Sequence, residues 1–256
     1  MIVVLSEVSF HSKQVKNKEV TTMNVSGKTA VVFGGTSGIG LATTKQLAAK
    51  GAKVIAVSRN PDRAGNVPAG VTLAKCDVLD RDAVSALLKE HAPFEILVSA
   101  ATGGSRALGP FLEMDMDGYK ASFDKLWGYA NIVRLGAQHM TKDGSLVLVS
   151  GAPARNCKPG QVALSSVGGA VEAMVRAVAP EIAPRRLNVV SPGSIDTPMV
   201  SLEGEARNEM YAKATAENLI PRAGTADEVA QGIMFVIEND FVTGTTVDVD
   251  GGWLLS

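Results

Sequence analysis

The stretch VVFGGTSGIG, residues 31–40, joins an apolar run to a pattern typical of a helix, LATTKQLAAKG. Its glycines Gly34, Gly38 and Gly40 permit a tight turn and a close approach of the backbone to a ligand. A helix that begins here presents free N–H groups and partial positive charge to a pyrophosphate. Placed directly after a first strand, the turn favours a dinucleotide-binding site over a plain connecting loop.

The rest of the chain alternates in the same way. Apolar runs predict strands at 29–33, 53–58, 71–76, 95–100, 145–150, 187–191 and 245–249. Helical patterns fall near 39–50, 80–90, 117–140, 162–183 and 226–238. Such alternation is typical of parallel strands with crossover helices on both faces. We therefore predict an α/β fold in which one doubly wound, Rossmann-type parallel sheet of about seven strands forms a single domain.

The predicted domain spans residues 23–256, and residues 1–22 are expected to be a poorly ordered N-terminal extension. The stretch MIVVLSEVSF has no basic start and is too short an apolar run for a signal peptide or a membrane span. Met23 is a candidate for the native start.

Composition limits the classes of partner. The chain has 256 residues, 46% of them hydrophobic, which is enough to bury a large core. Its formal charge of -1, without a dense Lys/Arg run, indicates neither nucleic acid nor a membrane surface as partner. Cys76 and Cys157 are too few for a disulfide framework or a zinc site, so we interpret them as buried apolar residues and expect no metal and a reducing cytoplasm. A small molecule is the expected ligand.

The end of the second predicted strand, VIAVSRN, indicates which dinucleotide is bound. It carries Ser58, Arg59 and Asn60, where an enzyme that prefers NAD tends to place an acid against the ribose 2′-hydroxyl. The Arg59 guanidinium can instead form a forked contact with a 2′-phosphate. We predict NADP(H), with a solvated loop arginine as the alternative interpretation of Arg59.

Further motifs give the chain a resemblance to the short-chain dehydrogenase/reductase family over nearly all of 24–256. They are CDVLD at 76–80, SPGSIDTPM at 191–199 and FVTGTTVDVDGG at 241–252, in the family's order and spacing. The resemblance implies that a nicotinamide cofactor is held by Gly34, Thr36, Ser37, Gly38, Ile39, Gly40, Ser58, Arg59, Asn60, Asp77, Val78, Ser99, Ala100, Ala101, Pro192, Gly193, Ile195 and Thr197.

The chain departs from this family at all four usual catalytic positions. Lys125 stands where an Asn is expected, Gly151 where the Ser is expected, and Leu164 and Gly168 where the Tyr and Lys are expected. Loss of such a general acid costs about 10²–10⁴-fold in rate. The chain resembles a divergent branch that lacks the Ser, Tyr and Lys and that pairs the motifs KLWG, at 125–128, and SGAPAR, at 150–155.

Lys125 is the leading replacement. In a helical projection of 117–140 it lies off the polar stripe that contains Lys120 and Arg134, on a side where an ammonium needs a partner. We predict that Lys125 stabilises the developing oxyanion or donates the proton, with Ser150 or Arg155 orienting the substrate. The alternatives are that Lys125 lies at a subunit contact, that Arg155 is a surface residue and that Ser150 binds only backbone.

Two adjacent glycines, Gly168 and Gly169, would together cost roughly 2 kcal/mol inside a helix. Close helix packing explains them, or else Gly168 opens room beside the nicotinamide ribose. A helical flap at 199–220 is expected to cover an apolar substrate.

The sequence thus predicts an NADP(H)-dependent oxidoreductase with a remodelled site that transfers hydride to a small apolar carbonyl or iminium substrate. A non-redox cyclase or isomerase and an NADP-binding sensor or subunit remain alternatives. The resemblance also implies a homodimer or homotetramer.

Overall fold

The computed structural model describes residues 22–102, 104 and 106–256. The predicted extension at 1–22 therefore lies outside the described residues, except for Thr22. Thr22 forms an antiparallel bridge with Asn239, and the N–H of Met23 donates to the carbonyl of Glu238 at 3.0 Å. The described chain thus begins beside the end of helix α7 (Ala226–Glu238).

Seven parallel strands form one sheet in the order β3-β2-β1-β4-β5-β6-β9, which confirms the predicted doubly wound fold. Their bounds are β1 Thr29–Phe33, β2 Lys53–Ser58, β3 Thr72–Lys75, β4 Phe94–Ser99, β5 Met140–Val149, β6 Arg186–Pro192 and β9 Thr246–Val249. Each overlaps one predicted run. The largest difference is that β5 begins at Met140, because this residue pairs with Phe94 at the start of β4.

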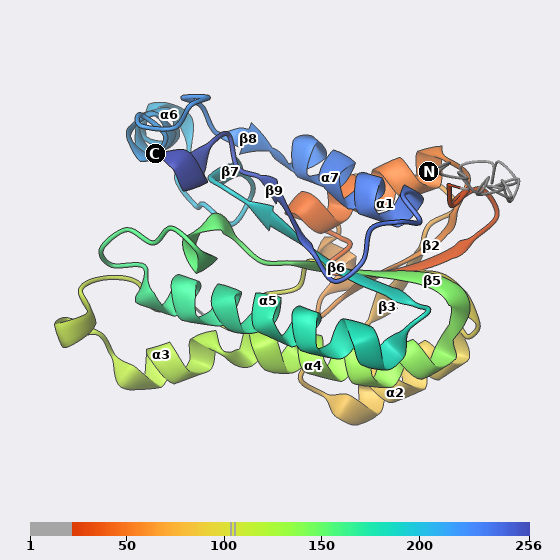
Figure 1. Ribbon diagram of the computed structural model, residues 1–256. Coiled ribbons are helices and arrows are strands. Elements are labelled where there is room, and N and C mark those ends of the chain that lie inside the picture. Colours follow the sequence, from red (N-terminus) through yellow and green to blue (C-terminus); the bar gives the residue numbers. More distant parts are fainter. Residues whose placement is uncertain (1–21, 103, 105) are drawn as a thin grey trace, which may run out of the picture.

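Helices cover both faces of the sheet (Figure 1). Helices α1 (Gly38–Ala49) and α7 lie on one face, and α2 (Arg81–Glu90), α4 (Asp124–Gly136) and α5 (Val162–Ile182) lie on the other. Strand β1 shows why its sequence is a continuous apolar run. Val31 and Phe33 point into the core under α2, α4 and α5, while Ala30 and Val32 point into the core under α1 and α7.

The predicted single helix at 117–140 is wrong, because two helices occupy this stretch. Helix α3 (Met116–Ser122) ends at a turn in which the Phe123 N–H donates to the Lys120 carbonyl, and α4 follows. The Ser122 hydroxyl accepts the N–H of Ala107 at 2.9 Å and so ties this turn to the loop after β4. Helix α4 ends at Gly136, where a Cβ would lie 2.4 Å from the side chain of Leu97.

The predicted flap region is an excursion between two short strands. Strand β7 (Ile195–Asp196) pairs in parallel with β8 (Gly224–Thr225), and helix α6 (Gly204–Ala214) lies between them. This two-stranded ladder was not predicted. Five short 3-10 helices complete the secondary structure of the described residues: η1 Pro61–Arg63, η2 Phe111–Glu113, η3 Ala137–His139, η4 Ala152–Ala154 and η5 Trp253–Leu255.

One helix in the described part of the chain, α5, is long and apolar enough to cross a membrane. Several of its apolar residues, including Val171 and Val175, belong to the core under the sheet, and the core helix of a sheet protein meets the same criterion.

Both cysteines are free, and Cys76 is buried as predicted, whereas Cys157 is exposed.

Strand β1 lies between β2 and β4, so the chain winds away from β1 in both directions. The loops after β1 and β4 diverge at such a switch point and leave a crevice at the carboxyl ends of the strands. The site described next lies in this crevice.

Candidate active site

The glycine turn after β1 opens the first turn of α1 toward the crevice. Gly34 and Gly38 have φ values of 76° and 50°, a region that favours glycine. A Cβ at Gly40 would lie 2.1 Å from the Gly34 carbonyl oxygen, so this position has no room for a side chain. The Ser37 side chain makes no capping hydrogen bond at α1, which leaves the first amides of the helix available to an anion.

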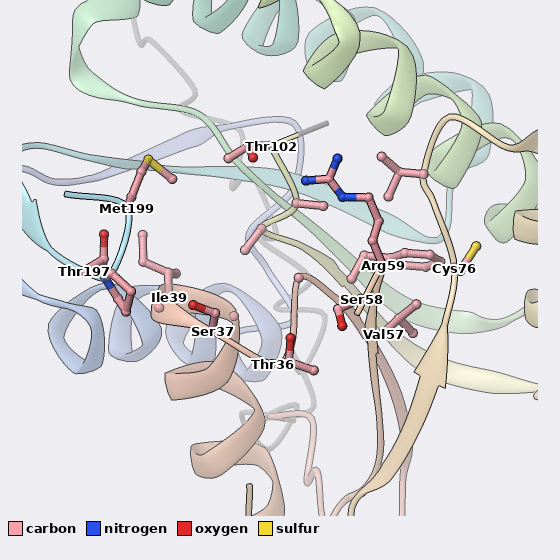
Figure 2. A pocket seen from close by; sticks show the side chains of 18 residues that line it. Thr36, Ser37, Ile39, Val57, Ser58, Arg59, Cys76, Thr102, Thr197 and Met199 are labelled. Carbon is pink, nitrogen blue, oxygen red and sulfur yellow. The ribbon is translucent and has the colours of Figure 1, made fainter. Parts of the chain in front are cut away.

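A cavity of about 360 Å³ lies in front of this turn. Figure 2 shows the Arg59 side chain extending into it from the end of β2, with Thr36 and Ser37 on the glycine turn. Twelve of the predicted cofactor residues line this cavity: Gly34, Thr36, Ser37, Gly38, Ile39, Gly40, Ser58, Arg59, Val78, Ala100, Ala101 and Thr197. Of the described residues that line it, Arg59 is charged and none is a carboxylate.

Three predicted cofactor residues line neither this cavity nor the one beside it: Asn60, Asp77 and Ser99. The Asp77 carboxylate accepts the N–H of Leu79 at 3.0 Å and so closes a local turn. Asn60 precedes the short helix η1, and Ser99 is buried at the end of β4. The structure therefore does not bring these three side chains to the crevice.

Five further residues line the first cavity and were not predicted as site residues: Phe33, Val57, Cys76, Thr102 and Pro198. Met199, from the predicted flap, lines it as well. Val57 is the penultimate residue of β2 and Cys76 directly follows β3, positions from which the crevice could have been predicted. Burial raises the pKa of the Cys76 thiol to about 11, with smaller contributions from Asp80 and Asp77. The thiol therefore stays protonated, and Cys76 lines the cavity without acting as a nucleophile.

A second cavity, of about 310 Å³, adjoins the first. The two share Ile39, Ala100, Thr102, Thr197 and Met199. The predicted residues Lys125, Ser150, Pro192, Gly193 and Ile195 line the second cavity. Its apolar wall includes Ala163, Leu164, Val167, Val200, Met210 and Trp253.

Lys125 reaches this second cavity from the first turn of α4 and is half-buried. Its ammonium donates to the Ser150 carbonyl at 3.3 Å and lies 5.6 Å from the centroid of the Tyr129 ring. Burial, reinforced by the charge of Arg106, lowers the pKa of Lys125 to about 7. Lys125 can therefore exchange a proton near neutral pH.

Ser150 supports this arrangement rather than facing a ligand with its hydroxyl. The buried hydroxyl donates to the Gly168 carbonyl at 3.3 Å, while the Ser150 carbonyl accepts from Lys125. The residue thus connects β5, α5 and α4. This geometry favours the backbone-binding alternative for the Ser150 hydroxyl.

Arg155 does not line either cavity, so the structure does not support its predicted orienting role. Its guanidinium forms ion pairs with Asp248 on β9 and, at 3.3 Å, with Glu172 on α5. Two carboxylates hold Arg155 away from the crevice. The surface-residue alternative was therefore closer to the structure.

Leu164 and Gly168 both line the second cavity, where the family resemblance places the usual Tyr and Lys. A Cβ at Gly168 would lie 2.9 Å from the Ala154 Cβ and 3.1 Å from the Ser150 hydroxyl. At Gly169 the nearest atom would be the Ala154 carbonyl oxygen at 3.8 Å. Close packing of α5 on η4 therefore explains Gly168, but it does not explain Gly169.

The three tyrosines do not replace the missing acid. Tyr129 and Tyr211 line the second cavity, yet their hydroxyls donate to the Val149 carbonyl at 2.9 Å and the Ile195 carbonyl at 3.1 Å. The Tyr119 hydroxyl donates to the Ser166 hydroxyl at 3.0 Å. Burial raises the pKa of Tyr129, so this phenol keeps its proton.

Arg106 is the most important residue that sequence reasoning missed. It lies in the loop between β4 and η2 and lines the second cavity, close enough to lower the pKa of Lys125. Its position in the sequence could have indicated it, since it is the only basic residue between β4 and α3.

Within the described ranges, no group of three His, Cys, Asp or Glu side chains is placed to hold a metal ion.

Comparison with known proteins agrees with this geometry. A family model described as Enoyl-(Acyl carrier protein) reductase matches residues 34–254. The 3-oxoacyl-(acyl-carrier-protein) reductase of Thermotoga maritima is 32% identical over 253 residues, which cover 91% of this chain and 100% of that protein.

Two solved structures are also similar. A short-chain dehydrogenase of Burkholderia cenocepacia in complex with NADP has a TM-score of 0.79 at 27% identity, covering 90% of this chain and 99% of that one. The ligand-free aldohexose dehydrogenase of Thermoplasma acidophilum has a TM-score of 0.82 at 26% identity, covering 92% of this chain and 97% of that one. The fold, the glycine turn and these matches together establish that the chain is an oxidoreductase of the short-chain dehydrogenase/reductase family.

Proposed function

We propose that the protein is an NADP(H)-dependent oxidoreductase of carbonyl compounds in which the Lys125 ammonium acts in place of the family's usual tyrosine. The first cavity would hold the adenosine and pyrophosphate part of the nucleotide, and the second would hold the reacting carbonyl group. When bound, the nicotinamide supplies or accepts the two electrons of the reaction as a hydride. The remaining chemistry falls to side chains of this chain.

The residues of the first cavity fit a phosphorylated dinucleotide. The open first turn of α1 can accept the pyrophosphate. Thr197 lies on the other side of the turn, where a Cβ built on Gly38 would be 3.5 Å from the Thr197 Cβ. Arg59 would bind the 2′-phosphate of NADP(H), and the lining has no acid to bind a free 2′-hydroxyl. The similar Burkholderia cenocepacia structure contains NADP, which supports the same choice here.

The lowered pKa of Lys125 is the observation that carries the proposed chemistry. Of the described side chains that line the second cavity, Lys125 alone has a pKa near 7, while the tyrosine hydroxyls donate to the protein. In the reducing direction, the carbonyl oxygen would take its proton from Lys125 Nζ, and the neutral amine would regain a proton from water. The Ser150 carbonyl would keep Nζ in place during this exchange.

A carbonyl substrate agrees with the charges in the cavity better than an iminium does. Arg106 and Lys125 both line it, and the described lining contains no carboxylate. A cationic iminium would be repelled by these side chains, whereas developing negative charge on a carbonyl oxygen would be stabilised. We therefore drop the iminium alternative and keep the non-redox catalyst and the sensor as outcomes of the test.

The flap at 199–220 would cover the apolar part of the substrate. Met199, Val200, Met210 and Tyr211 come from this segment and line the second cavity, as Leu164 does. Arg207 on α6 forms an ion pair with Asp196 of β7 and so connects the flap helix to that strand. Opening the flap would admit a small apolar molecule, and closing it would exclude water.

We also propose a homodimer or homotetramer, as is common in the family, and a reducing, cytoplasmic compartment, because both cysteines are free. Trp127 on α4 is 62% exposed and Leu255 near the C-terminus is 78% exposed, which supports burial of both in subunit contacts. Sedimentation of the wild-type chain would test the assembly, and a monomer would contradict it.

A substrate screen tests the proposed function directly. Aldehydes, ketones, oxo acids, enones and imines are mixed with NADPH, and loss of absorbance at the reduced-nicotinamide band is followed. Turnover of a carbonyl compound that falls sharply in Lys125→Met is the expected result. If no compound is turned over while NADPH binds, the sensor or non-redox alternative replaces the proposal.

A further inference from the structure

The second cavity contains two cations from different elements. Arg106 enters from the loop after β4, and Lys125 enters from α4. The side chains that line the cavity in the described part of the chain include no aspartate and no glutamate. The cavity therefore carries net positive charge.

Carboxylates of the protein do not neutralise this pair. Arg155, Arg186, Arg207 and Arg222 each form an ion pair with an acid, but the ion pairs among residues 22–102, 104 and 106–256 include neither Arg106 nor Lys125. Lys125 instead has a backbone carbonyl and the Tyr129 ring as neighbours. Lys125 is half-buried and Arg106 is exposed, so solvent screens part of their repulsion, and a ligand anion bound beside them would reduce the rest.

The pair is also electrostatically coupled. Burial is the main cause of the low pKa of Lys125, and the positive charge of Arg106 lowers it further. An anion bound at Arg106 would cancel that second contribution and raise the pKa of Lys125 again. Anion binding would thus favour the protonated form of Lys125, which supplies the proton that the proposed reaction consumes.

We infer that the substrate is an oxo acid, with its carboxylate bound by the forked guanidinium of Arg106, its carbonyl oxygen facing Lys125, and an apolar body. This assignment rests on the function proposed above. A guanidinium pairs with a planar carboxylate through two parallel hydrogen bonds, which fixes orientation as well as charge. The wall formed by Leu164, Val167 and Met210 suits an aliphatic chain.

The balanced reduction gives a hydroxy acid. The π bond of the carbonyl group breaks, its carbon gains a hydride from NADPH and its oxygen gains a proton from Lys125. NADPH is oxidised to NADP⁺, and Lys125 is reprotonated by water. The substrate carboxylate stays bound to Arg106 throughout, and negative charge develops on the carbonyl oxygen beside Lys125 only during the reaction.

A kinetic comparison tests the carboxylate. The 2-, 4- and 5-oxohexanoates are assayed against their methyl esters, which differ from them by the loss of the charge. The best acid should exceed its ester by roughly tenfold in kcat/KM, a difference of about 1.4 kcal/mol, because Arg106 is exposed in the ligand-free protein and solvent screens part of its charge. Arg106→Gln should lower kcat/KM for the acid to the value for its ester, and Arg106→Lys should retain part of the difference between them. Arg134→Gln, at an exposed position of α4, should change kcat/KM for neither compound.

A binding measurement keeps this inference separate from the proposed function. The chain has two tryptophans, and Trp253 lines the second cavity, so in Trp127→Phe its fluorescence reports on that site alone. Hexanoate should change this fluorescence saturably, methyl hexanoate should not, and adding Arg106→Gln should abolish the response.

The outcomes distinguish the two claims. Arg106-dependent hexanoate binding without turnover of any carbonyl compound would support the anion site and overturn the proposed function. Equal turnover of acids and esters, with no hexanoate response, would overturn the oxo acid and leave the proposed function intact. Should Arg106→Gln fail to fold, Arg106→Lys decides in its place: hexanoate binding weakened in that variant supports the site, and unchanged binding of hexanoate and its ester overturns it.

Discussion

Replacing the adjacent glycines of α5 by alanine should have opposite effects on stability. In a helix interior, Gly→Ala gains about 1 kcal/mol when the new methyl group meets nothing. Gly169 meets this condition, because its Cβ would have the Ala154 carbonyl oxygen at 3.8 Å as its nearest neighbour. At Gly168 the Cβ would lie 2.9 Å from the Ala154 Cβ, an atom fixed to the backbone of η4.

The magnitude follows from these two distances. Overpacking of this kind costs about 1–3 kcal/mol, which outweighs a propensity gain of about 1 kcal/mol. Gly168→Ala should therefore lower the free energy of unfolding by roughly 0–2 kcal/mol. In a domain of this size, about 1 kcal/mol moves Tm by roughly 2–4 °C.

Thermal and urea unfolding of the two single variants provide the assay. Gly169→Ala should raise Tm, Gly168→Ala should lower it or leave it unchanged, and NADPH binding should be retained in both. Equal stabilisation of both variants would refute the conclusion that close packing on η4 requires Gly168.

Two further predictions concern the cofactor and the lost catalytic residues. NADPH should bind at least tenfold more tightly than NADH, a difference of about 1.4 kcal/mol, and titrations should show that Arg59→Ala removes most of this preference; equal affinities in the wild-type protein would contradict the NADP(H) assignment. The double variant Leu164→Tyr, Gly168→Lys should not reduce simple ketones that the wild-type protein leaves unreacted, because a side chain at 168 collides with Ala154 and Gly151 supplies no hydroxyl. Robust turnover of such ketones in an absorbance assay would instead indicate simple decay of an older site.

The sequence predicts the parts of this fold that local chemistry determines. Strand β1 is buried on both faces, so its residues form an unbroken apolar run that is visible without a structure. Gly40 is visible for a similar reason, since the turn leaves no room for a Cβ beside the Gly34 carbonyl. The strand order then follows from alternating strands and helices.

Contacts between distant segments could not be predicted in this way. Arg155 pairs with Asp248, 93 residues further along the chain, and no pattern near Arg155 indicates that partner. Arg106 lies in a segment without periodicity, so no local pattern indicates that it lines the same cavity as Lys125. The break at Phe123 was missed because the residue keeps a right-handed helical conformation, with φ -75° and ψ -7°. For the same reason the helical projection still placed Lys125 on the inward side.

The pH dependence of kcat/KM in Lys125→Met, beside the wild-type protein, tests the central claim most directly. Because burial and Arg106 hold the pKa of Lys125 at about 7 in the free enzyme, wild-type carbonyl reduction should be high below that pH and should fall above it, as the amine loses its proton. Lys125→Met should lose about 10²–10³-fold in kcat and lose this pH dependence.

Two controls accompany the measurement. Lys125→Met should keep its Tm and its NADPH affinity, because an apolar side chain of similar length replaces a half-buried ammonium. Lys120→Met, at an exposed position of α3, should leave the rate and its pH profile unchanged. Full activity of Lys125→Met with an unaltered pH profile would contradict the account and leave Lys125 as a structural residue.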